Sequence, residues 1–227
     1  MNYVSILGDS ISTFEGQNPH GFLVYYTNTM QAENGLLSVE NTWWAKVLRA
    51  LNAQLCVNNS YSGSMVSGSC FPAGISDRRL MYLHTDEKPN LILIYMGLND
   101  YAHGVSSLHN DETDFQDPVY CFEDAYDIML GKIRKYYPDA TVICSTLIRP
   151  FVIGYENLNF PEVYKGAVFE DYNAAIRKSA HKHDCQLADL SSYNEKYETI
   201  DGVHPTVNGQ LTFADLWIKC LIDLGLC

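Results

Sequence analysis

One serine and one aspartate–histidine pair stand out as residues whose types and spacing suit covalent chemistry. Ser10 follows Gly8 and Asp9 directly after an apolar run, and Asp201 precedes His204 by three residues near the C-terminus. Histidine can take the proton of an attacking serine, and a carboxylate can fix the imidazole tautomer and stabilise the imidazolium that forms. Either motif alone is also typical of a turn or a helix cap. Together they indicate a serine nucleophile.

Two further motifs could supply hydrogen-bond donors to a developing negative charge. Gly63 lies between two serines after one apolar run, and Asn99 lies within Gly97–Asp100 after another. A glycine N–H and an asparagine amide are donors of the kind that stabilise the oxyanion formed when a serine attacks a carbonyl group. The motifs therefore favour acyl-group chemistry, provided that the fold brings them together.

Five short runs rich in β-branched residues predict the strands that must position these motifs. They alternate with longer amphipathic stretches, a pattern typical of parallel strands joined by crossover helices. Residues 91–95 are apolar at every position, as expected of a strand covered on both faces. The predicted strands are Tyr3–Leu7, Gln54–Asn58, Leu91–Met96, Thr141–Ser145 and Gln186–Asp189, and the predicted helices are Thr42–Leu51, Ile75–Leu83, Cys121–Tyr136, Tyr164–His183 and Thr206–Leu224.

Three long segments fit neither pattern, namely 12–40, 102–118 and 149–162. They follow the first, third and fourth predicted strands, and ligands of open parallel sheets bind beyond the carboxyl ends of the strands. We therefore expect the three segments to converge on one rim. The acidic stretch Asn110–Asp114 lacks the glycine and distal glutamate of a calcium loop, so we interpret it as a solvated loop. No linker-like change in composition divides the chain, which predicts a single domain over 1–227.

In chain order, the motifs around Ser10, Gly63, Asn99 and His204 resemble the four blocks of the SGNH hydrolases, also called the GDSL family. The resemblance implies a flavodoxin-like three-layer α/β/α sandwich with a five-stranded parallel sheet, and hydrolysis of esters or thioesters without a metal or other cofactor. It implies that Ser10 is the nucleophile, His204 the general base and then acid, and Asp201 its orienting carboxylate. It also implies an oxyanion hole made by the N–H groups of Ser10 and Gly63 and by the Asn99 amide.

The substrate is less clearly written in the sequence. Aromatic residues gather in the first long segment and after Asn99, which suits apolar contact with a sugar ring or a modest acyl chain. We expect a small acyl ester, such as an O-acetylated carbohydrate. A thioesterase, a lysophospholipase-type enzyme, an acyltransferase and a non-catalytic carbohydrate-binding protein on the same scaffold remain alternatives. The candidate substrate contacts are Tyr25, Tyr26, Tyr101 and Arg149.

The amino-acid composition disfavours several classes of binding partner. The 227 residues carry a formal charge of −12, which works against binding to nucleic acid or to an anionic membrane surface. No apolar run approaches the roughly 20 residues that span a bilayer, and no signal peptide is visible, so a cytoplasmic protein is expected.

The seven cysteines show no C-x-x-C spacing and are expected to be reduced core residues. The absence of G-x-G-x-x-G disfavours a nucleotide or flavin binder, and the oligomeric state is left open.

Overall fold

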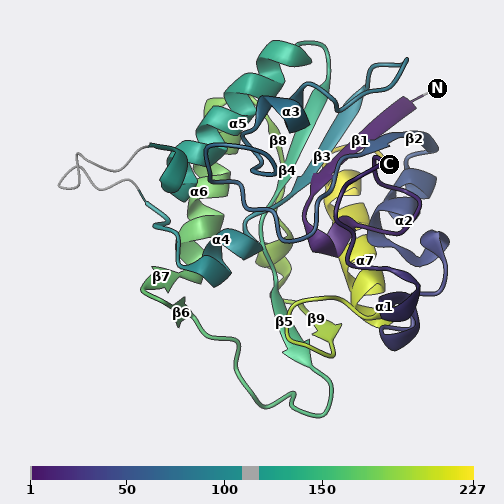
Figure 1. Cartoon of the computed structure of the whole chain (residues 1–227), viewed down its shortest axis with the longest axis vertical. Coiled ribbons are helices and arrows are strands. Elements are labelled where there is room, and N and C mark those ends of the chain that lie inside the picture. Colours follow the sequence, from purple (N-terminus) through teal and green to yellow (C-terminus); the bar gives the residue numbers. More distant parts are fainter. Residues whose placement is uncertain (1, 109–117) are drawn as a thin grey trace.

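A five-stranded parallel sheet lies at the centre of the molecule (Figure 1). The computed structural model describes residues 2–108 and 118–227. Within them the strand order is β2-β1-β3-β4-β8, which is the flavodoxin-like order. Parallel pairing places Gly8 at the end of β1 beside Tyr95 at the end of β3. The five strands are β1 (Asn2–Gly8), β2 (Ala53–Asn58), β3 (Leu91–Tyr95), β4 (Thr141–Ser145) and β8 (Gln186–Ala188).

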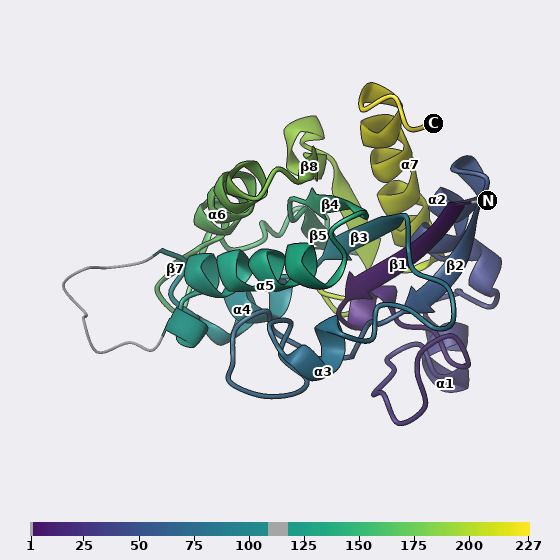
Figure 2. The same ribbon diagram turned by 90° about the horizontal axis from the view of Figure 1, so that it is seen from above.

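These bounds confirm the predicted fold class, since every predicted strand is present with its ends shifted by one residue at most. All five residues of β3 are buried, because helices cover the sheet on both sides. Figure 2 shows α5 (Phe122–Tyr136) and α6 (Phe169–Lys182) on one face of the sheet, and α2 (Trp43–Ala50) and α7 (Val207–Asp223) on the other. The chain therefore forms a three-layer sandwich.

Several expectations about the connecting segments were wrong. The segment 12–40 contains the short helix α1 (Asn28–Glu33), and the helix α4 (Leu98–His103) extends into the segment 102–118. The helix predicted from Ile75 shrinks to α3 (Asp77–Leu80), a single turn. Turns this short give too few residues for a helical period to be visible in the sequence.

The helix predicted from Tyr164 begins only at Phe169, because a small hairpin precedes it. Strands β6 (Val163–Tyr164) and β7 (Ala167–Val168) pair antiparallel, and Gly166 between them adopts φ +85°, which favours glycine. The acidic stretch Asn110–Asp114 lies outside the described residues.

A second parallel pair of strands, which the sequence did not predict, lies beyond the carboxyl edge of the main sheet. Strand β5 (Arg149–Val152) pairs with β9 (Lys196–Thr199), although 149–162 had been expected to contain no strand. The pair joins the start of one rim segment to the strand that leads into Asp201 and His204. It therefore couples two parts of the rim that are far apart in the chain.

The described residues contain no helix that is both long and apolar enough to cross a membrane. All seven cysteines are free, and Cys121, Cys144 and Cys220 are buried. The expected core position is wrong for Cys70 and Cys227, which are exposed.

One buried arginine ties the ends of two neighbouring strands together. The Arg79 side chain has no exposed surface, and its Nη2 group donates hydrogen bonds to the carbonyl oxygens of Gly8, at 2.8 Å, and of Asn59. Its Nη1 group donates to Ser64 Oγ at 2.9 Å and to the Pro72 carbonyl at 3.0 Å. A guanidinium carries five N–H donors in a rigid fork, so it can satisfy several carbonyl oxygens at once. Arg79 thereby fixes the ends of β1 and β2 relative to each other.

Replacing this arginine should destabilise the whole sheet edge. We expect Arg79→Met to lower the free energy of unfolding by about 3–5 kcal/mol, because it leaves buried carbonyl oxygens without donors. Urea unfolding followed by tryptophan fluorescence measures this loss. Arg49→Met is the matched control, since Arg49 pairs with Glu40 on the exposed surface, and it should leave the unfolding midpoint nearly unchanged. Equal midpoints for the two variants would contradict the account.

Candidate active site

The turn after β1 presents Ser10 at the carboxyl edge of the sheet. Gly8 is required there because a Cβ atom would lie 2.6 Å from Ser12 Oγ and 2.8 Å from Ser60 Oγ. The Asp9 carboxylate accepts a hydrogen bond from the Ile11 N–H at 3.0 Å, which caps the short 3₁₀ turn that begins at Ser10. The turn thus holds the serine hydroxyl in a fixed place.

The loop after β9 carries Asp201 and His204 to the same place. Tyr197 on β9 donates its hydroxyl proton to the Val203 carbonyl at 2.9 Å. The hydroxyl of Tyr26 donates to the carbonyl of Pro205 at 2.6 Å, directly after the histidine. These two hydrogen bonds come from buried side chains, so they fix the loop backbone from below.

A continuous chain of hydrogen bonds joins the three predicted catalytic side chains. His204 Nε2 lies 2.9 Å from Ser10 Oγ, and His204 Nδ1 lies 2.6 Å from Asp201 Oδ2. The other carboxylate oxygen of Asp201 accepts hydrogen bonds from the backbone N–H groups of Val203 and His204 at 2.9 and 2.7 Å. With Nδ1–H donating to the carboxylate, Nε2 is free to accept the serine proton. The arrangement can therefore generate a serine nucleophile.

The pKa values of two carboxyl groups in the site are shifted in opposite directions. Burial raises the pKa of Asp201, but the hydrogen bonds from the His204 side chain and backbone outweigh it and hold that pKa well below its usual range. Burial raises the pKa of Asp9 to about 6, despite the hydrogen bond from Ile11 and the nearby charges of His204 and Arg79. Asp201 is thus a permanent anion beside the imidazole.

The predicted oxyanion donors lie around Ser10. The N–H groups of Ser10 and Gly63 have no hydrogen-bond partner within the described residues, and Gly63 is in a positive-φ conformation. The Asn99 amide lines the same cavity, where its nitrogen donates to the Ser64 carbonyl at 3.1 Å and to Asp9 Oδ2 at 3.3 Å. The hydrogen bond from Asn99 to Asp9 is long, so the same amide N–H can also donate to an oxyanion that forms beside Ser10.

A cavity of about 450 Å³ opens beside these groups. Its lining is mostly apolar, and none of the described lining residues is Asp, Glu, Lys or Arg. A cavity of this kind favours an uncharged substrate. The lining residues are Ser10, Tyr25, Ser62, Gly63, Leu98, Asn99, Tyr101, Ala102, Phe160, Pro161, Tyr164, Gly202, Val203 and His204.

Only two of the four candidate substrate contacts reach this cavity. Tyr25 and Tyr101 line it, whereas Tyr26 is fully buried beneath it. Arg149 lies in a separate hollow of about 220 Å³, where it forms a two-point ion pair with Glu162 at 2.9 and 2.7 Å. The structure therefore does not bring Tyr26 and Arg149 to the serine.

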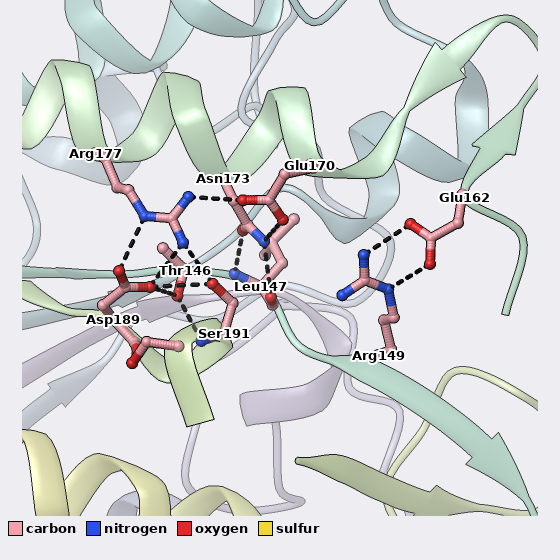
Figure 3. Close-up of polar contacts among 10 residues, drawn as sticks. Thr146, Leu147, Arg149, Glu162, Glu170, Asn173, Arg177, Asp189 and Ser191 are labelled. Atoms are coloured by element: carbon pink, nitrogen blue, oxygen red, sulfur yellow. Dashed lines mark hydrogen bonds and ion pairs between the residues drawn. The ribbon is translucent and has the colours of Figure 1, made fainter. Parts of the chain in front are cut away.

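The Arg149–Glu162 ion pair, drawn in Figure 3, instead closes the ends of a wall segment, 149–162. This segment lines the cavity through Phe160 and Pro161. The hydroxyl of Tyr101 on α4 donates to the Pro161 carbonyl and ties the segment to the helix that carries Asn99. One wall of the cavity is thus held at both ends.

A polar network fixes the base of this wall segment to α6. Figure 3 shows Asn173 bonded to the Leu147 backbone, with its Oδ1 accepting from the Leu147 N–H at 2.7 Å. Arg177 bridges Glu170 and Asp189 at 2.7 and 2.9 Å. The chain that leaves β4 therefore enters the segment from a rigid start.

Sequence reasoning missed the wall residues Phe160 and Tyr164 and the arginine Arg79. The two aromatic residues lie in or beside the segment 149–162, which the sequence predicts to be part of the rim. The adjacent Phe160 and Pro161 in that segment could have indicated an apolar wall. Arg79 gave no signal, because an arginine next to Arg78 and close to two acidic or polar residues is ordinary on a helix surface.

No three His, Cys, Asp or Glu side chains in the described ranges lie close enough together to hold a metal ion.

The comparison with known proteins bears on which chemistry the site performs. A family model described as GDSL-like lipase/acylhydrolase matches residues 2–216. The chain belongs to the GDSL-like lipase/acylhydrolase family. It is therefore a GDSL-like acylhydrolase, a member of a carboxylic ester hydrolase family, and the recognition from the four motifs is confirmed.

Solved structures of other proteins share the fold. One from Bacteroides ovatus, described as GDSL-like lipase, is 23% identical with a TM-score of 0.75 over 99% of each chain. Another from Bacteroides uniformis is 24% identical with a TM-score of 0.74, over 98% of this chain and 96% of that one. Est24 of Sinorhizobium meliloti, a carbohydrate acetylesterase, is 14% identical with a TM-score of 0.62, over 99% of this chain and 100% of its own. No curated protein matches the acylhydrolase.

The Asn99 amide offers a direct test of the site. We expect Asn99→Ala to fold normally and to lose about 10²–10³-fold in kcat on p-nitrophenyl acetate, because one oxyanion donor is removed. Steady-state kinetics and circular dichroism measure the two effects. Asn208→Ala is the control, since Asn208 donates to Glu198 on the surface and should keep full activity. Full activity in Asn99→Ala would remove this amide from the oxyanion hole.

Proposed function

We propose that this acylhydrolase cleaves small acyl esters through an acyl-enzyme on Ser10, with His204 and Asp201 completing a catalytic triad. The observation that carries the proposal is the unbroken hydrogen-bond chain from Asp201 through His204 to Ser10, at the edge of an apolar cavity. A serine hydroxyl is a weak nucleophile unless a base takes its proton, and this geometry supplies the base.

In the acylation step, Ser10 Oγ attacks the carbonyl carbon of the ester while His204 Nε2 takes the hydroxyl proton. The carbonyl oxygen becomes an oxyanion that the N–H groups of Ser10 and Gly63 and the Asn99 amide stabilise. The imidazolium then gives its proton to the alcohol oxygen as the carbon–oxygen bond breaks. The alcohol leaves, and the acyl group stays on Ser10.

In the deacylation step, His204 takes a proton from water as the water oxygen attacks the acyl carbon. The same donors stabilise the second oxyanion, and the proton returns to Ser10 Oγ when the acid leaves. The Asp201 carboxylate stabilises the imidazolium in both steps. The protein's charge of −12 favours departure of the anionic acid.

An acetyl ester of a neutral carbohydrate is the proposed substrate. Three features support it: apart from the histidine, no described residue that lines the cavity is acidic or basic, the walls carry Tyr101, Phe160 and Tyr164, and the cavity's size suits a small ligand. Aromatic faces pack well against sugar rings. The structural similarity to the carbohydrate acetylesterase Est24 agrees with this choice. The cytoplasmic location expected from the sequence stays a prediction.

A panel of acyl donors tests the substrate class. We expect hydrolysis of acetylated sugars and p-nitrophenyl acetate to exceed that of octanoyl esters by at least about tenfold in kcat/KM, since the walled cavity limits the acyl group. An acetyl thioester carries the same acyl group and tests the leaving group instead. Ser10→Ala should abolish all these activities. Faster cleavage of long-chain esters or thioesters would contradict the proposal, and acyl transfer to added glycerol in preference to water would assign a transferase instead.

The wall residue Phe160 should contribute to sugar binding rather than to chemistry. Phe160→Ala should raise KM for an acetylated sugar by about 2–10-fold with kcat nearly unchanged, because an aromatic contact of roughly 0.5–1.5 kcal/mol is lost. Tyr155→Ala is the control, since Tyr155 lies in the same segment and is exposed outside the cavity. Equal KM values for Phe160→Ala and wild type would remove Phe160 from the sugar contact.

A further inference from the structure

Tyr25 contacts two members of the triad at once. Its ring lies parallel to the His204 imidazole, with the ring centroids 3.4 Å apart and the planes 9° apart. Its hydroxyl donates a hydrogen bond to Asp201 Oδ2 at 3.1 Å, the same oxygen that accepts from His204 Nδ1 at 2.6 Å. The tyrosine therefore covers the face of the general base and shares its carboxylate.

The surrounding chain holds Tyr25 in this place. Its backbone N–H donates to Thr13 Oγ1 at 3.0 Å, and the Thr13 hydroxyl donates to the Ser10 carbonyl at 2.8 Å. The next residue, Tyr26, packs edge-on against the Tyr25 ring at a centroid distance of 5.0 Å and is itself bonded to the Pro205 carbonyl. Tyr25 is thus anchored both to the nucleophile turn and to the histidine loop.

We propose that Tyr25 is a positioning residue that keeps the His204 imidazole aimed at Ser10 and tunes its basicity through Asp201. This inference rests on the proposed function, because it assigns Tyr25 a role in the same triad. The stacked ring blocks rotation of the imidazole away from the serine, and an aromatic face attracts the imidazolium that forms. The hydroxyl acts in the opposite sense, since a donor to Asp201 weakens the attraction between the carboxylate and the imidazolium.

The ring and the hydroxyl of Tyr25 act in opposite directions on the protonated form of His204. A stack alone would favour the protonated imidazole, which cannot accept the serine proton. The hydroxyl hydrogen bond to Asp201 opposes that preference. The groups that face His204 are Ser10 and Asp9 from the β1 turn, Asp201 from its own loop and Tyr25 from the first rim segment. The carboxylate of Glu33 on α1 acts electrostatically on Tyr25.

The variant Tyr25→Phe tests the effect of the hydroxyl separately from that of the ring. The variant keeps the stack and loses the donor to Asp201, so we expect the pKa of His204 to rise by roughly 0.5–1 unit. The acid limb of kcat/KM on p-nitrophenyl acetate should shift upward by the same amount. Titration of the His204 imidazole by ¹⁵N NMR, assigned with His204→Asn, measures the shift without any substrate.

Tyr193→Phe is the matched control. The Tyr193 hydroxyl donates to Asp223 Oδ2 at 3.1 Å, a hydrogen bond of the same type and length on the surface away from the triad. It should leave both the imidazole titration and the acid limb unchanged. A shift in Tyr25→Phe no larger than that in Tyr193→Phe would overturn the inference.

Tyr25→Leu removes the ring as well as the hydroxyl. We expect its His204 pKa to lie below that of Tyr25→Phe, because the attraction of the ring face is gone, and the rate of Ser10 labelling by a small fluorophosphonate to fall by about tenfold. A raised KM with an unchanged labelling rate would make Tyr25 a substrate contact only and would overturn the proposal. Absence of labelling in the wild type would instead refute the proposed function, while the imidazole titration would still decide the role of Tyr25.

Discussion

The hydrogen bond between His204 Nε2 and Ser10 Oγ joins residues 194 positions apart, and the architecture of the rim serves to make that contact. Ser10 depends on the end of β1, and the end of β1 depends on the buried Arg79 that holds it against the end of β2. His204 depends on β9, which is outside the main sheet and pairs with β5. A movement of about 1 Å in either support would separate base from nucleophile.

Charge is distributed unevenly around this contact. Arg79 and Asp9 lie buried on the side of the sheet edge, where the opposite charges moderate each other's desolvation and Asp9 orients the Asn99 amide. The carboxylate of Asp201 lies on the outer side and keeps its charge through four hydrogen bonds. The cavity between them is apolar, which strengthens the electrostatic interactions made there with an oxyanion.

The sequence predicts the sheet well because each strand is a local feature. Runs such as Leu91–Tyr95 are apolar at every position, and the motif around Ser10 follows the first such run. Pairing of β5 with β9 and the Arg149–Glu162 ion pair are decided by contacts between distant segments, so no local pattern reports them. Tyr25 illustrates the same limit, since its residue type suggested contact with substrate whereas its stack on His204 exists only in the folded chain.

The acyl-enzyme on Ser10 is the central claim, and its capture is the most direct measurement. Wild-type protein mixed with p-nitrophenyl acetate, quenched in acid within the first turnover and analysed by intact mass and peptide mapping should carry one acetyl group on the peptide that contains Ser10. The Ser10→Ala variant treated in the same way should carry none there. Hydrolysis by the wild type with no acetyl group on Ser10, or with the group on another side chain, would contradict the account.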